Sequence, residues 1–257
     1  MRAYTDFASV YDVFMADTPY EEWSQFLLEI FEKNQIHTGH LILDLGCGTG
    51  TLTELMAKAG YDMIGIDNAP EMLAIAMEKK EESSSEILYL LQDMREMELY
   101  GTVKAVISIC DSLNYLLEEE DIIETFRLIN NYLDPKGLFI FDFNTVYKYR
   151  EVIGDTTIAE NREHCSFIWE NYYHEEEGIN EYDLTLFVEN KGEESELCGY
   201  YSKFQETHFQ RGYTLEQMES FILQSGMEFV EAIDTDTKGR VTETSERIYV
   251  IAKECGK

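Results

Sequence analysis

Long apolar runs are missing from this sequence of 257 residues. No stretch approaches the roughly 18 apolar residues that a membrane helix needs, and residues 1–6 lack the apolar core of a signal peptide. The cysteines are odd in number and include no C-x-x-C pair, which disfavours a disulfide framework and a zinc site. We therefore expect a cytoplasmic protein with no membrane contact and no metal, whose free thiols are Cys47, Cys110, Cys165, Cys198 and Cys255.

Basic residues are also scarce, because 20 lysines and arginines stand against 51 acidic residues and give a formal charge of −31. Binding to a nucleic-acid backbone depends on neutralising phosphates with lysine and arginine. No basic run indicates a local patch, and acidic runs such as 118–121 and 175–177 are typical of a solvated surface. The composition therefore makes nucleic acid an unfavourable partner.

Apolar residues, in contrast, are plentiful at 44%, which is enough for a packed core. Short apolar runs predict strands at 41–45, 62–66, 87–91, 103–109 and 138–141, the last after a turn at 134–137. Apolar residues at helical spacing predict helices at 52–59, 70–80 and 121–133. Strands that alternate with helices indicate a doubly wound parallel sheet.

Two capping boxes mark the starts of further helices. Thr18 and Glu21 have the Thr-x-x-Glu spacing, with Pro19 between them at the first helical position. Thr214 and Gln217 repeat the spacing near the other end of the chain, before two last strands at about 228–234 and 247–252.

The middle of the chain has a different texture. From 156 to 211, aromatic and β-branched residues alternate with charged ones, as antiparallel strands with one solvated face do. The predicted fold class is therefore α/β, with a doubly wound, mainly parallel seven-stranded sheet and an inserted antiparallel β lid. The core comprises 1–145 and 212–257, and the insertion comprises 146–211.

A glycine-rich turn, Asp-Leu-Gly-Cys-Gly-Thr-Gly at 44–50, follows the first strand. Glycines at such a turn let the backbone approach a ligand closely. The third glycine comes one residue too early for the dinucleotide fingerprint, and Thr51 stands where that glycine belongs. Asp44 would repel a pyrophosphate but would attract a ligand with an ammonium and a sulfonium group. The turn therefore favours S-adenosylmethionine over NAD.

Two more acids end the next strands. Asp67 lies where an acid can accept both ribose hydroxyls, although it can also cap the helix that follows. Asp93, after the third strand, can accept from the exocyclic amine of adenine, or it can be a solvated loop acid.

On these motifs the chain resembles the class I S-adenosylmethionine-dependent methyltransferases, through about residues 41–145 and the terminal strands. The resemblance implies that the glycine turn holds the methionine part, that Asp67 binds ribose, that Asp93 reads adenine between Met72 and Met94, and that residues 109–115 face the methyl group. The expected cofactor site comprises Asp44, Gly46, Cys47, Gly48, Gly50, Asp67, Asn68, Met72, Gln92, Asp93, Met94 and Cys110.

Residues 4–12 are similar to the opening of bacterial small-molecule N-methyltransferases, including amino-sugar and glycine-type enzymes. There a tyrosine caps the methionine end of the cofactor, which implies this role for Tyr11. Tyr4 and Phe7 can equally be hydrophobic anchors of the N-terminal segment. The chain also resembles an uncharacterised Firmicute-type group of methyltransferases with the same insertion.

Methyl transfer from a sulfonium is an in-line displacement, in which the enzyme mainly positions the nucleophile. Four polar residues follow strands at the edge where open α/β sheets bind ligands: Asp111, Asn114, Asp142 and Asn144. Each can position an acceptor or satisfy nearby backbone groups. We predict Tyr11, Asp111 and Asn144 as catalytic residues. Polar residues of the insertion can line the pocket or belong to plain sheet packing: Trp169, Tyr172, Tyr173, His174, Tyr201, His208 and Arg211.

The sequence thus predicts methyl transfer from S-adenosyl-L-methionine to a small-molecule acceptor at an amine nitrogen, with S-adenosyl-L-homocysteine as product. Two alternatives remain: a protein or RNA methyltransferase, and a non-catalytic S-adenosylmethionine-binding module that acts through a protein partner. We expect a monomer or a homodimer.

Overall fold

The computed structural model of the chain describes residues 4, 7–190 and 200–257. The expectations for Cys198 and for residues 1–3, 5 and 6 therefore lie outside the described residues. Within the described part, Cys47, Cys110 and Cys255 are free thiols, and Cys165 is buried. No described helix is long and apolar enough to cross a membrane, and no described acids, histidines and cysteines form a group that would hold a metal ion.

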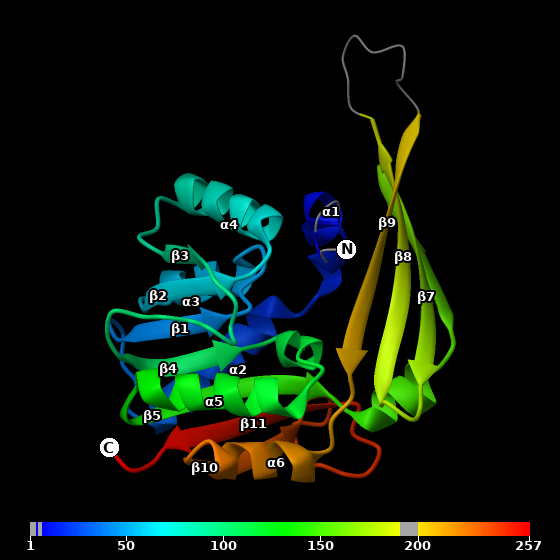
Figure 1. Cartoon of the computed structure of the whole chain (residues 1–257). Coiled ribbons are helices and arrows are strands. Elements are labelled where there is room, and N and C mark those ends of the chain that lie inside the picture. The colour runs from blue at the N-terminus through cyan, green and yellow to red at the C-terminus, as the bar shows by residue number, and fades with distance from the viewer. Residues whose placement is uncertain (1–3, 5–6, 191–199) are drawn as a thin grey trace.

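The predicted seven-stranded sheet is present, with its strands in the order β10-β11-β5-β4-β1-β2-β3 (Figure 1). Neighbours from β5 to β3 pair in parallel, and β11 runs antiparallel to both β5 and β10. The mainly parallel doubly wound sheet is therefore confirmed. Its strands are β1 (Leu41–Leu45), β2 (Asp62–Asp67), β3 (Leu88–Leu91), β4 (Val103–Ser108), β5 (Leu133–Asn144), β10 (Met227–Asp234) and β11 (Arg247–Glu254).

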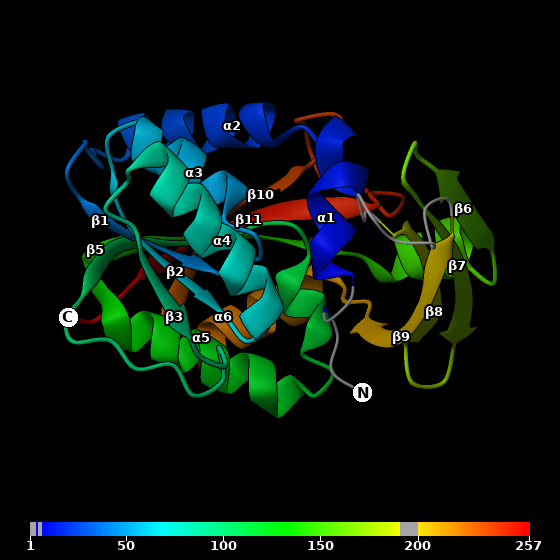
Figure 2. The same cartoon turned by 90° about the horizontal axis from the view of Figure 1, so that it is seen from above.

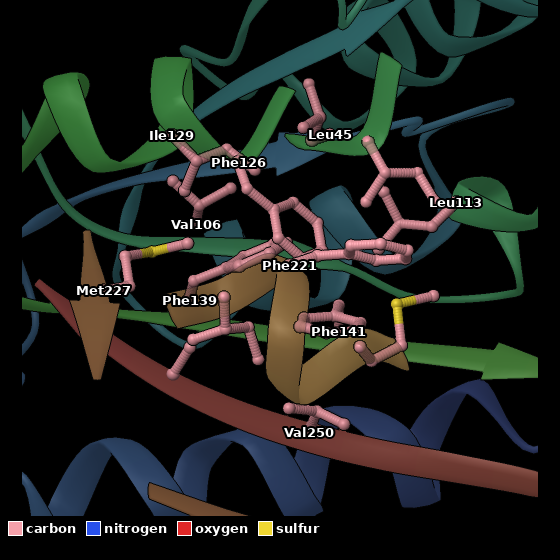
Figure 3. Close-up of a cluster of buried hydrophobic side chains, with 14 of the residues drawn as sticks. Leu45, Val106, Leu113, Phe126, Ile129, Phe139, Phe141, Phe221, Met227 and Val250 are labelled. Carbon is pink, nitrogen blue, oxygen red and sulfur yellow. The ribbon is translucent and has the colours of Figure 1, made fainter. Parts of the chain in front are cut away.

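Helices cover both faces of this sheet (Figure 2). One buried cluster joins α2 (Tyr20–Lys33) and α3 (Thr51–Lys58) to the strands, and α4 (Pro70–Ser83) lies beside α3. Another cluster joins α5 (Glu119–Tyr132) and α6 (Leu215–Gln224) to the opposite face. Its centre is aromatic: the ring of Phe126 lies 5.2 Å from that of Phe139, which stacks at 4.6 Å on Phe141 (Figure 3). Both faces of the central strands are therefore buried, which leaves the strand ends as the place for a site.

The inserted segment forms a separate four-stranded antiparallel sheet in the order β6-β7-β8-β9. Its strands are β6 (Thr157–Asn161), β7 (Cys165–His174), β8 (Ile179–Glu189) and β9 (Tyr201–Arg211), after a π-helical turn η3 (Lys148–Ile153). The chain leaves the core after β5 and returns to it at α6, where Thr145 forms a bridge with Tyr213. Figure 1 shows this sheet standing to one side of the core, facing the short helix α1 (Ala8–Phe14).

Of the two predicted capping boxes, the structure contains one. The capping box of Thr214 and Gln217 is confirmed at the start of α6. The predicted box at Thr18 is wrong: α2 begins after Pro19 without a side-chain cap, and the Thr18 hydroxyl lies 3.6 Å from the sulfur of Met15. A 3₁₀ turn, η1 (Met15–Asp17), precedes Thr18 and holds it away from the helix end. The turn expected at 134–137 is an irregularity within β5, where Lys136 has a φ of 62° and the register with β4 shifts.

Candidate cofactor and acceptor site

A cavity of about 610 Å³ opens at the carboxyl ends of β1 to β4. This volume falls within the range of roughly 300–1,000 Å³ of small-ligand sites. Its walls come from the loops after these strands and from the N-terminal segment with α1 and the first residues of α2. The topology therefore gathers at one edge residues that are distant in the sequence.

The glycine turn after β1 forms the floor of this cavity. The amides of Gly46 and Cys47 both donate to the Ile66 carbonyl, at 2.8 and 3.0 Å. Gly46 has a φ of 78°, and a Cβ added there would lie 2.5 Å from Ser112 Oγ. Gly48 donates its amide to Asp67 at 2.8 Å. Gly50 does not line the cavity, because it starts α3 against the ring of Tyr89.

Two acids flank the turn, of which Asp44 is buried and Asp67 is partly buried. Asp44 accepts a hydrogen bond of 2.6 Å from the Thr53 hydroxyl, and burial raises its pKa to about 7. Asp67 accepts the amides of Gly48 and Ala69 at 2.8 and 2.9 Å, and burial also raises its pKa. Asp67 thus lines the cavity and also binds the backbone at the start of α4, so both of its predicted roles have a geometric basis.

The far end of the cavity has the third acid. Arg95 binds Asp93 at 2.6 Å, and this hydrogen-bonded guanidinium lowers the pKa of Asp93. Gln92 accepts the Glu98 amide at 2.9 Å. Met72 and Met94 line the same cavity, with their Cε methyl groups beside Gly48 and Gly46 of the glycine turn. The structure therefore brings to one cavity every predicted cofactor residue except Gly50: Asp44, Gly46, Cys47, Gly48, Asp67, Asn68, Met72, Gln92, Asp93, Met94 and Cys110.

The N-terminal segment closes one side of the cavity with aromatic rings. Tyr4, Tyr11, Tyr20 and Trp23 all line it. Helix α1 is held there by Asp12, which pairs with Lys79 of α4 at 2.7 Å and accepts the Thr49 hydroxyl at 2.7 Å. Phe7 and Phe14 of this segment pack against the inserted sheet, so the anchoring alternative holds for Phe7. Tyr4 packs there too but also lines the cavity.

Two of the predicted catalytic residues do not line the cavity. Asp111 binds Arg247 at 3.1 Å and Gln210 at 2.7 Å. Asn144 donates to the Tyr149 hydroxyl at 3.1 Å and accepts from Lys148 at 3.0 Å. Partners from later segments therefore hold both side chains within the protein, whereas Tyr11 does line the cavity.

The other two polar strand-end residues satisfy backbone groups. Asp142 accepts the amides of Cys110 and Asp111, at 3.1 and 2.8 Å. Asn114 donates to the carbonyls of Asn144 and Arg211. This is the structural alternative anticipated for such residues.

None of the polar residues singled out in the insertion lines the cavity. Tyr172 and Tyr201 are exposed, and His174 pairs with Glu181 near the surface. Trp169 and Arg211 are partly buried, with Trp169 packed in the cluster beneath α1 and Arg211 donating to the Leu117 carbonyl. His208 is buried and lies 3.1 Å from the hydroxyl of Tyr115. Ser112 and Tyr115 line the cavity within the expected segment 109–115. Sequence reasoning missed the lining residues Tyr20 and Trp23, for which the density of aromatics before the first strand was the available signal.

The lining chemistry fits the expected cofactor. Four acids line the cavity, and none of its described lining residues is a lysine, arginine or histidine: the acids are Asp44, Asp67, Glu71 and Asp93. A pyrophosphate would meet no cation there, whereas a sulfonium and an ammonium are favoured. The close approach of Gly46 to Ser112 leaves no room for a side chain beside the turn.

Comparisons with known proteins decide the family. Residues 42–137 match the family model described as "Methyltransferase domain". The chain is 38% identical over 255 residues to "Putative methyltransferase YqeM" of Bacillus subtilis (strain 168), covering 98% of this chain and 97% of that one. The chain is a class I S-adenosylmethionine-dependent methyltransferase. A relative from Geobacillus sp. (strain WCH70), "Putative methyltransferase GWCH70_2453", is 35% identical over 98% of this methyltransferase and 99% of its own length.

Solved structures of methyltransferases share the whole fold, including the inserted sheet. A crystal structure of an S-adenosylmethionine-dependent methyltransferase from Clostridium acetobutylicum has a TM-score of 0.86 at 28% identity, covering 99% of this methyltransferase and 100% of that chain. The structure of CalS10, an amino pentose methyltransferase from Micromonospora echinaspora, has a TM-score of 0.73 at 15% identity, covering 99% of each chain. The expected Firmicute-type group and the cofactor are thereby confirmed.

Proposed function

We propose that this methyltransferase methylates a small-molecule amine. The observation that carries the proposal is the wall of the cavity that faces the end of β4, where Tyr4, Tyr11, Tyr20, Trp23 and Tyr115 gather around acidic and neutral groups. Aromatic faces attract ammonium cations, and the lining acids add favourable charge. An anionic acceptor would meet no cationic side chain among the described lining residues.

The tyrosines support this reading because they stay uncharged. Burial raises the pKa of Tyr4, Tyr11 and Tyr115 well above the ordinary value of 10. Neutral phenols offer hydroxyl groups and ring faces that can orient an amine. Asp111 and Asn144 enter this proposal only as structural residues, because Asp111 binds the Arg247 guanidinium and Asn144 binds the Tyr149 hydroxyl.

We assign the inserted sheet the role of a lid, with 146–211 as the lid and 1–145 and 212–257 as the core. The sheet packs on α1, which in turn roofs the cavity, so an acceptor has to fit beneath a helix and not across an open surface. This arrangement and the charge of −31 favour a small acceptor over RNA. The cofactor-lining residues, Tyr11 among them, keep the roles proposed from the sequence.

Within this proposal, the cofactor supplies a methyl group on a sulfonium. The chain has to hold the amine in line with that group at roughly 3–3.5 Å and to exclude water. Tyr11 and Tyr4 approach from the N-terminal segment, and Ser112 and Tyr115 approach from the end of β4. Two walls thus meet where an amine would be oriented.

Amines of several classes provide the test, beginning with amino sugars because one fold relative is named for an amino pentose. The panel adds glycine-type amino acids, peptides and RNA, and the readout is S-adenosylhomocysteine formed, corrected for hydrolysis. We expect turnover with a small amine and N-methylation by mass spectrometry. Turnover on peptides or RNA alone would replace the acceptor class, and no turnover despite tight cofactor binding would support the binding-module alternative.

Two glycine variants provide the matched control for cofactor dependence. Gly46 and Gly39 have φ values of 78° and 79°, but only Gly46 would place a Cβ against another residue, Ser112. Both alanine variants bear a backbone strain of about 1–2 kcal/mol. We expect Gly46→Ala to weaken cofactor binding by at least about tenfold and Gly39→Ala to leave it unchanged, as measured by calorimetry.

A further inference from the structure

A chain of polar side chains runs from the cavity into the inserted sheet. Tyr4 and Tyr115 both line the cavity, and their hydroxyl oxygens lie 2.7 Å apart. The Tyr115 hydroxyl also lies 3.1 Å from Nδ1 of His208, and Nε2 of His208 lies 3.1 Å from a carboxylate oxygen of Glu206. The chain thus joins the N-terminal segment, η2 (Ser112–Tyr115) and β9.

The two backbone amides bound by Glu206 favour one direction for the hydrogen bonds of this chain. Glu206 accepts the backbone amides of Tyr4 and Phe7 at 2.8 and 3.0 Å, as an ionised carboxylate does. Nε2 of His208 therefore donates to Glu206, and in a neutral ring Nδ1 is left as an acceptor. Tyr115 then donates to Nδ1 and accepts from Tyr4, so every bond points from the cavity towards Glu206.

His208 is buried among aromatic side chains. Its side chain and that of Glu206 are each only 1% exposed. Tyr182 of β8 stacks on the ring at 4.9 Å, and Tyr4 meets it edge-on at 5.0 Å. Tyr182 also bonds the Tyr115 hydroxyl at 2.6 Å. Burial raises the pKa of all three phenols, with the nearby charge of Asp111 adding to the effect on Tyr4 and Tyr182, so they carry protons without becoming ionised.

We propose that Tyr4, Tyr115, His208 and Glu206 form the relay that removes the proton an ammonium acceptor must lose before methylation. The inference rests on the proposed amine acceptor, because an ammonium has no lone pair to attack a methyl group. Tyr4 is the group that touches the acceptor; Tyr115, His208 and Glu206 act through it.

The transfer is balanced at each atom. The N–H bond of the ammonium breaks as Tyr4 Oη takes its proton, the Tyr4 hydroxyl proton moves to Tyr115, and that of Tyr115 moves to Nδ1 of His208. The acceptor becomes a neutral amine, and His208 becomes an imidazolium that Glu206 stabilises. The amine then forms its N–C bond as the S–C bond breaks. After product release, the proton of His208 returns through the hydroxyls of Tyr115 and Tyr4 to solvent in the emptied cavity.

The first measurement needs no acceptor. Two-bond ¹H–¹⁵N correlation spectra report which nitrogen of each of the five histidines carries a proton, and the signals missing from His208→Asn identify His208. We expect neutral His208 to have Nε2 protonated and Nδ1 bare in the full-length protein. A proton on Nδ1 of the neutral ring would overturn the relay, because Tyr115 would then have no acceptor there.

The second measurement uses sinefungin, a cofactor analogue in which a carbon that bears an amine replaces the sulfonium that bears the methyl group. The amine of sinefungin therefore lies where the cofactor has its methyl group. Near neutral pH, we expect the ammonium of bound sinefungin to pass one proton to Nδ1 of His208, so that both ring nitrogens carry a proton. Bound S-adenosylhomocysteine, which has no such ammonium, should leave Nδ1 bare. Tyr115→Phe should bind sinefungin but lose this response. Tyr20→Phe, which alters a lining tyrosine outside the relay, should keep it.

Three outcomes would each refute the relay. His208 could stay unchanged in the sinefungin complex, Tyr115→Phe could show a response equal to that of the unaltered protein, or the protein could bind S-adenosylhomocysteine without binding sinefungin. The His208 response and the turnover of amines are separate readouts, so a failure of the relay and a failure of the amine acceptor can be distinguished. Turnover of amines without a His208 response leaves the amine acceptor standing and removes the relay. A His208 response without turnover of any amine shows that the chain conducts a proton but overturns the amine acceptor, and with it the role of the relay in methylation.

Discussion

The two sheets of this methyltransferase bury different kinds of side chain. The central strands of the core sheet are apolar on both faces, as Ile107 and Phe139 illustrate. The covered face of the inserted sheet changes along its length. It is apolar where Phe167 and Leu186 meet α1, and it is polar at the end that carries Asn171, Asn180, His208 and Gln210, all buried.

The difference lies in where each sheet places its polar side chains. The core needs polar groups only where its strands end, since its interior provides packing. The inserted sheet brings buried polar groups to those same strand ends, as Gln210 does when it bonds Asp111 at 2.7 Å. Buried polar groups cost stability unless they are paired, so their concentration at one end indicates a function there beyond holding the sheet in place.

The junction of the two sheets should give the largest loss of stability. Arg247 binds both Asp111, at 3.1 Å, and fully buried Asp142, at 2.9 Å. Arg247→Met would leave buried carboxylates without this partner, so we expect a loss of about 3–5 kcal/mol in the free energy of unfolding, measured in urea. As the control, Arg127→Met removes an exposed pair with Glu124 and should cost less than about 0.5 kcal/mol. Equal losses would contradict the contrast between buried and exposed pairs.

In the core sheet, Asp44 should make the free energy of unfolding depend on pH. Because burial raises its pKa from 3.8 to about 7, the folded state binds more protons than the unfolded state between these values. Stability should therefore fall as pH rises from about 4 to 7, by at most roughly 4 kcal/mol from this residue.

Asp44→Asn should remove most of that slope in urea unfolding of the cofactor-free protein. Asp62→Asn changes an exposed acid at the start of β2 and should leave the slope in place. If Asp44→Asn keeps the slope, another group is responsible for it.

The smallest expected effect concerns α6, on which the chain returns from the inserted sheet to the core. Thr214→Ala removes a capping box that the structure contains and should cost about 1 kcal/mol of unfolding free energy. Thr18→Ala removes a threonine with the same sequence spacing but without a helix cap and should cost close to nothing. Similar costs for both would show that the hydroxyl of Thr214 acts through something other than α6.

The fold was largely predictable because local patterns determine it. The buried run at 41–45 and the glycines after it specify β1 and its turn without help from distant residues. The capping box at Thr214 was correctly predicted for the same reason. Thr18 failed because the preceding 3₁₀ turn, which no local pattern announced, redirects its hydroxyl.

The parts of the site that are formed by strand ends and their turns were predictable. The parts that depend on contacts between side chains distant in the sequence were less predictable. Gly46 and Asp67 follow from strand ends. Asp111 has the same strand-end position, but its side chain is captured by Arg247, 136 residues further along. Tyr115 and His208 lie 93 residues apart, and only the docking of the inserted sheet brings them together.

The place of β11 has a consequence for biosynthesis. This strand pairs with β5 on one side and β10 on the other, yet it is translated after the inserted sheet and α6. During synthesis from the N-terminus, the edge of β5 therefore stays unpaired while the hairpins of the inserted sheet, whose contacts are more local, can form first. A ribosome stalled before residue 247 would carry a nascent chain with an open apolar strand edge, the kind of edge that invites pairing with other chains, beside a complete inserted sheet.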